Sequence, residues 1–154
     1  MENVTIIIPR RGINDDGKGK KYALKKLITA AESKYVWLRV DATTVPAEEL
    51  ATVPSLLSND PSLIILPLRM TEGKGTLIEC LQQTEYAAIQ TLTMLAAEQR
   101  HAVMCSGANL IVERNDWLEC YPDLHTEIPS GDDMFLLESM KKRNKKVIDR
   151  KSVV

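Results

Sequence analysis

The chain has 154 residues, a length that suits one domain with a sizeable core. Hydrophobic residues make up 44% and charged residues 27% of it, and the formal net charge of -1 excludes a global basic field for nucleic acid. No apolar stretch approaches the ~20 residues that a membrane-spanning helix needs, and residues 1–10 lack the pattern of a signal peptide.

The elements expected in the first half alternate between strands and helices. The β-branched run at 4–8 predicts a buried strand, and apolar residues at helical spacing predict a helix over 22–33. A strand over 35–40, a helix over 47–57 and a strand over 62–67 follow. This order predicts an α/β layer architecture with parallel strands.

The second half begins with a long helical pattern over 76–100. Its apolar stripe consists of Leu77, Leu81, Ala88, Leu92 and Leu95. Glu85 falls on this stripe, and we interpret it first as a boundary residue and second as a buried polar contact. Shorter elements follow: strands at 102–104 and 110–112, a helical turn at 116–120, a helix over 132–142 and a strand at 147–148.

Cysteine and histidine usage bounds the compartment and the metal chemistry. Cys80, Cys105 and Cys120 are scattered without a CxxC pair, which predicts reduced thiols in a cytoplasmic protein. His101 and His125 have no His or Cys partner at metal-ligand spacing, so no zinc site is predicted. The basic residues after position 140 are interpreted as a solvated helix face and tail rather than a membrane-surface or nucleic-acid patch. No aromatic residues interleave with them, which weakens an interpretation by base stacking.

A glycine-rich loop over 12–18 has the spacing of a phosphate-binding P-loop as far as Lys18. The next position is Gly19, where that motif needs a hydroxyl for magnesium. Asp15 and Asp16 would also repel the phosphates. An exposed loop with glycines at its turns is therefore favoured over a nucleotide hydrolase.

Asp41 stands at the end of the strand predicted over 35–40. Ligands of open α/β sheets bind beyond the carboxyl ends of strands, so Asp41 could hold a ribose hydroxyl or a metal. An Asx turn or a helix cap is the alternative.

The segment 106–109 reads Ser-Gly-Ala-Asn, and its small residues allow close approach of a ligand. Its alternative is a tight turn in which Asn109 bonds its own backbone.

The segment 130–133 reads Ser-Gly-Asp-Asp before an apolar helix. Ser130 followed by Asp133 resembles a capping box, and acids in a first helical turn favour the macrodipole. A carboxylate held at a cleft edge and poised to take a proton is the functional interpretation. Both can hold at once, because a cap also fixes the position of the carboxylate.

Taken in order, segments 19–24, 35–41 with Pro46, 105–110 and 130–137 resemble a family 2 glycosyltransferase, and the resemblance spans about residues 3–147. It implies a GT-A fold, a three-layer α/β arrangement in which helices flank a mixed sheet, and usually inverting chemistry. Residues 1–154 would then form a single, partial catalytic domain that acts on a nucleotide-sugar donor and a carbohydrate or lipid-linked acceptor.

The resemblance also assigns roles by position. Asp133 matches the catalytic base and Asp132 its acidic neighbour. Gly19, Lys20 and Asp41 match donor-binding positions, and the loop beside the acceptor and donor sugar is matched by Gly107, Ala108 and Asn109. Asp41 is the first acid of the Asp-x-Asp motif, which implies a manganese or magnesium ion in the family.

Two departures lower the expected activity. Thr43 replaces the second acid of the metal motif, and threonine is a poor ligand for a hard cation. The opening strands and the uridine-binding motif are expected upstream of this chain, so we expect this piece to be impaired or inactive. The alternative is a non-catalytic carbohydrate-binding or subunit-assembly module that dimerises through an exposed sheet edge. Membrane contact, at the cytoplasmic face, is expected only through segments outside this chain.

Overall fold

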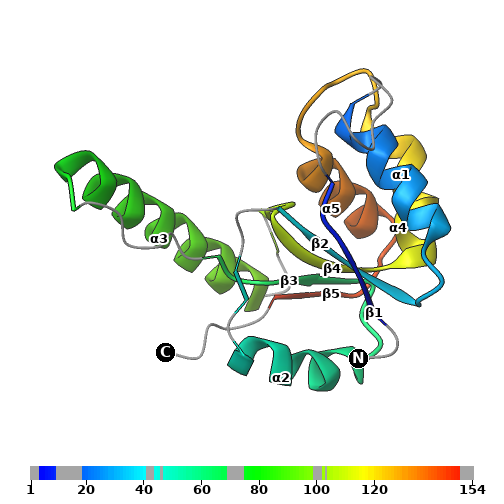
Figure 1. Ribbon diagram of the computed structural model, residues 1–154, viewed down its shortest axis with the longest axis horizontal. Helices are drawn as coiled ribbons and strands as arrows, with labels where there is room; N and C mark the ends of the chain where they lie inside the picture. Colours follow the sequence, from blue (N-terminus) through cyan, green and yellow to red (C-terminus); the bar gives the residue numbers. More distant parts are fainter. Residues whose placement is uncertain are drawn as a thin grey trace.

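The computed structural model describes residues 4–9, 19–40, 44–45, 47–68, 75–98, 102 and 104–149. It is an α/β fold built on one mixed sheet with the strand order β1-β2-β4-β3-β5 (Figure 1). The strands are β1 (Val4–Ile7), β2 (Tyr35–Arg39), β3 (Leu63–Ile65), β4 (Asn109–Glu113) and β5 (Val147–Asp149).

The pairing of the strands corrects the expectation of a parallel sheet. β1 pairs with β2 and β3 with β5 in parallel, but β4 inserts between β2 and β3 and runs antiparallel to both. The α/β class and the mixed, helix-flanked sheet are confirmed. The strand predicted at 102–104 is not confirmed, because Ala102 and Met104 lie outside helices and strands.

Helices cover both faces of the sheet (Figure 1). They are α1 (Lys20–Ala30), α2 (Ala47–Leu57), α3 (Leu77–Glu98), α4 (Arg114–Cys120) and α5 (Asp132–Lys142), with a 3₁₀ turn, η1 (Tyr121–Leu124), between the last two. One face packs against α1, α4 and α5, and the other packs against α2. Together these elements make three layers.

The alternation of side chains in β2 explains why a continuous apolar run forms a central strand. Val36 and Leu38 face the larger core with α1, α4 and α5, whereas Tyr35 and Trp37 face α2. All four are buried. Burial on both faces fixes the register, because a slip of one residue would exchange the two sets.

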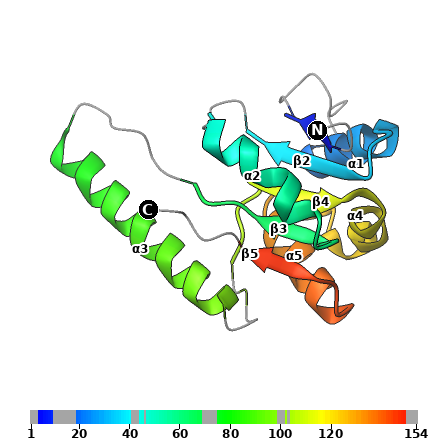
Figure 2. The same ribbon diagram turned by 90° about the horizontal axis from the view of Figure 1, so that it is seen from below.

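Helix α3 differs from the others because it projects away from the sheet, with its contact to the body beside β5 (Figures 1 and 2). The predicted apolar stripe is exposed, at 76% for Leu77, 62% for Leu81, 66% for Leu92 and 54% for Leu95. Glu85 is also exposed, so it makes no buried polar contact. Within the described part of the chain, no helix is long and apolar enough to cross a membrane.

Candidate functional site

Three distant segments bring four of the expected site residues together. Asp132 and Asp133 begin α5, Lys20 begins α1, and Gly107 lies in the turn before β4. The Lys20 Nζ atom lies 2.9 Å from Asp132 Oδ2 and donates to Oδ1 at 3.2 Å. The Gly107 N–H donates to Asp133 Oδ2 at 2.8 Å. The start of α5 is therefore bound to both other segments.

The carboxylate of Asp133 is held by backbone donors on both oxygens. In addition to the bond from Gly107, Oδ1 accepts the N–H of Met134 at 2.9 Å. Each carboxylate oxygen has two acceptor sites, so one on each oxygen remains after these bonds. The residue is half-buried at the start of its helix. This arrangement orients a carboxylate while leaving it able to accept a proton.

The capping-box interpretation of this segment is wrong. Gly131 is the N-cap of α5, with φ of 77°, and no side chain caps the helix. A β-carbon at position 131 would also meet the Phe135 ring at 3.2 Å. Glycine at 131 moves the cap one residue past Ser130 and leaves the Asp133 carboxylate to bond Gly107 instead.

The turn before β4 makes room for the contact with Asp133. Asn109 donates its N–H to the Ser106 carbonyl at 3.2 Å, and Ala108 donates to Ser106 Oγ at 3.4 Å, which confirms a tight turn. A β-carbon on Gly107 would lie 3.4 Å from Lys20 Nζ and 3.5 Å from Asp133 Oδ2. A longer side chain at position 107 would therefore fill the space between the lysine and the carboxylate.

Asn109 supports this turn from inside the protein. Its side chain is buried, accepts from Trp37 Nε1 at 2.8 Å and donates to the Pro67 carbonyl at 3.1 Å. Asn109 also lies opposite Arg39 in the sheet, so the carboxyl end of β2 and the start of β4 share one edge. The side chain thus ties the turn to β2 and to the chain after β3.

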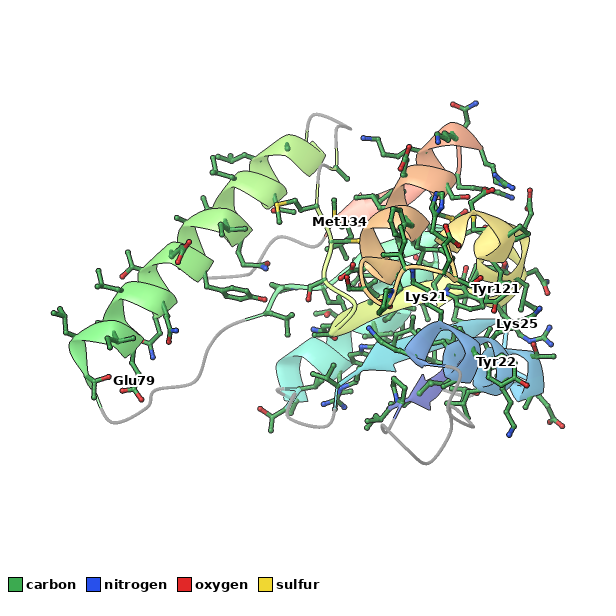
Figure 3. The ribbon with its side chains drawn as sticks, turned by 90° about the horizontal axis from the view of Figure 1, so that it is seen from above. Lys21, Tyr22, Lys25, Glu79, Tyr121 and Met134 are labelled. Carbon is green, nitrogen blue, oxygen red and sulfur yellow. The ribbon has the colours of Figure 1, made fainter. Side chains whose placement is uncertain are left out.

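Lys21 is a positioning residue that the sequence did not single out. It is only 4% exposed, and Nζ donates to the carbonyls of Leu124 and His125 at 2.6 and 2.8 Å. The same cation lies 4.8 Å from the ring centre of Phe135, between α1 and α5 (Figure 3). Lys20 and Lys21 therefore hold the two ends of the segment that leads from η1 into α5.

A signal for Lys21 was present in the sequence. The helix macrodipole disfavours cations in a first turn, and α1 begins with two lysines and no acid. Two lysines at the start of a helix therefore indicate that other groups outside the helix stabilise their charges. Gly19 precedes them as the N-cap of α1, with φ of 90°, a backbone conformation that favours glycine.

The other residues expected to bind the donor or a metal lie partly outside the described part of the chain. Asp41, Thr43 and the glycine-rich loop over 12–18 lie outside the described residues. Among the residues that are described, no group of three His, Cys, Asp or Glu side chains could hold a metal ion. Lys20 already neutralises Asp132, so the acidic pair of α5 does not fit a cation site, and we derive no step through a metal.

A pocket of about 600 Å³ lies along α5. Its lining combines apolar and charged side chains and consists of Ala102, Met134, Phe135, Leu137, Glu138, Lys141 and Lys142. Asp132 and Asp133 are not among these lining residues, so the pocket does not by itself place a ligand at the candidate carboxylate.

Thiol labelling is expected to distinguish the three cysteines. Cys105 and Cys120 are buried, and burial raises the pKa of both thiols, so their reactive thiolate forms are scarce near pH 8. Cys105 also donates to the Asp133 carbonyl at 3.1 Å. With iodoacetamide at pH 8, mass spectrometry should find rapid modification at exposed Cys80 alone. Equal labelling of Cys105 in the native protein would contradict its burial.

No protein-family model and no curated protein matches this sequence.

Proposed function

We propose that this chain is a glycosyltransferase domain of the GT-A type in which Asp133 is the catalytic base. The observation that carries the proposal is the meeting of Lys20, Gly107, Asp132 and Asp133 at one place. Lys20 is more than 80 residues from the other three in the chain. All four are among the residues to which the family resemblance assigns a role in the site.

In the proposed reaction, Asp133 accepts the proton of an acceptor hydroxyl. The acceptor oxygen forms a bond to the anomeric carbon of a nucleotide sugar as the bond to the diphosphate breaks, and the configuration inverts. The diphosphate leaves with the electron pair of the broken bond. Lys20 offsets the charge of Asp132, which would otherwise repel the charge on its neighbour. Gly107 keeps the approach to the carboxylate open.

Donor binding tests the proposal directly. We expect titration calorimetry with uridine-diphosphate sugars and manganese to give a dissociation constant of about 1 mM, because Thr43 stands where a second carboxylate would hold the ion. Lys20→Met should weaken this binding further, whereas Lys26→Met, on the same helix, should leave it unchanged. If no nucleotide sugar binds at millimolar concentration, the transferase proposal fails.

A non-catalytic carbohydrate-binding module is the second candidate, and the replacement at Thr43 favours it. Such a module would bind an oligosaccharide without consuming a nucleotide sugar. Incubating the chain with both substrates and measuring released nucleoside diphosphate separates the two functions. Release that depends on the acceptor supports transfer, and saccharide binding without release supports the module.

A further inference from the structure

The exposed side of α3 carries a regular seam. We define the seam as Ile78, Leu81, Glu85, Ala88, Leu92 and Leu95, which are all exposed. The steps between them alternate between three and four residues, as they do along the contact line of a coiled coil. The opposite side of the helix holds the less exposed residues, including buried Thr93. The seam therefore lies on the exposed side of α3, a helix that projects from the sheet (Figure 2).

We propose that this seam binds the same seam of a second copy of the chain, with the two helices antiparallel. The spacing is symmetric about a point between Tyr86 and Ala87. A two-fold axis at that point would place Ile78 opposite Leu95, Leu81 opposite Leu92, and Glu85 opposite Ala88. A surface that pairs with itself in this way is what a two-fold dimer requires.

The charges along the helix favour the antiparallel pairing. In a parallel pair, Glu85 would face Glu85 of the other copy, and like charges that face each other in an interface are costly. In the antiparallel pair it faces Ala88, whose methyl group leaves room for the carboxylate to reach water. α3 contains no lysine or arginine, which disfavours an anionic membrane surface as the occupant.

The size of the seam predicts a weak dimer. A helix of 22 residues is about 33 Å long, and a contact line about 10 Å wide covers a few hundred Å² on each copy. Summed over both copies, this area is below the roughly 1,000 Å² that a stable specific interface buries, so the association should be weak and transient. Glu85 at the centre weakens the contact further, because it must be partly desolvated.

Sedimentation equilibrium of the full chain from about 10 µM to 1 mM tests the dimer. We expect a reversible monomer–dimer equilibrium that the double substitution Leu81→Glu and Leu92→Glu abolishes. The double substitution Cys80→Glu and Ala87→Glu adds the same two charges at exposed positions outside the seam and should leave the equilibrium unchanged. Glu85→Leu should tighten the dimer at least about tenfold. A wild-type chain that stays monomeric at 1 mM, or a dimer that persists in the double variant, overturns the proposal; the second result would point to the sheet edge at β1.

Cross-linking tests the direction of the helices. In a Cys80→Ser background, one chain carries Ile78→Cys and another carries Leu95→Cys. Oxidising the mixture should give disulfide-linked heterodimers, because the antiparallel pair places these positions opposite each other. Homodimers of each variant, without heterodimers, would show a parallel pair and overturn the antiparallel geometry. This test does not depend on the proposed transferase activity.

Discussion

Replacing Asp133 by asparagine is expected to lower the residual rate of sugar transfer by this impaired chain by about 10²–10⁴-fold, the contribution of a general base. Asparagine has the same shape and can still accept the N–H of Gly107 through its amide oxygen, but its NH₂ group cannot accept the N–H of Met134. It cannot take up a proton from an acceptor hydroxyl. The loss of rate should therefore fall on the chemical step, with donor affinity close to that of the wild type. Folding stability should fall by about 1 kcal/mol, because the N–H of Met134 loses its acceptor.

Asp132→Asn is the matched control for this experiment. It removes the neighbouring carboxylate and its ion pair with Lys20 but leaves the carboxylate of Asp133 in place. We expect a smaller loss of transfer rate from it than from Asp133→Asn. Released nucleoside diphosphate gives the rate, and titration calorimetry gives donor affinity. A wild-type rate in Asp133→Asn would remove this residue from the role of base.

Local sequence patterns were sufficient to predict most elements of the fold. The helix over 132–142 and the helix over 47–57 have the bounds that helical spacing predicted, and the strand at 35–40 differs from β2 by one residue. The antiparallel insertion of β4 was not predictable in this way. Its partners lie in β2 and β3, and a run of apolar residues carries no information about which distant strand pairs with it.

The site shows the same division between local and non-local information. Lys20, Gly107, Asp132 and Asp133 were grouped through the family resemblance, and the structure brings them together. The helix cap was misplaced because the capping-box pattern gives no weight to a glycine with positive φ at position 131. The exposure of α3 was equally out of reach, because an amphipathic pattern identifies an apolar face without saying what covers it.

Lys21→Met is expected to lower the free energy of unfolding by about 2–3 kcal/mol, as estimated from the loss of buried hydrogen bonds to a charged donor. Methionine has a similar length and fills the same volume beside Phe135. It leaves the carbonyls of Leu124 and His125 without the donor that Lys21 gives them. Lys21 is also an unfavourable cation in the first turn of α1. Removing its charge regains only a few tenths of a kcal/mol of the lost stability.

Lys20→Met provides the adjacent comparison. The side chain of Lys20 is 39% exposed and forms a surface ion pair with Asp132, so its loss should cost about 1 kcal/mol or less. Urea unfolding followed by circular dichroism gives both free energies. If the free energy of unfolding of Lys21→Met lies within about 0.5 kcal/mol of the wild-type value, the two bonds from Lys21 to carbonyl groups do not stabilise the segment before α5. A large loss for Lys21→Met with a small one for Lys20→Met would show that the buried bonds of Lys21 stabilise this segment far more than the surface ion pair of Lys20.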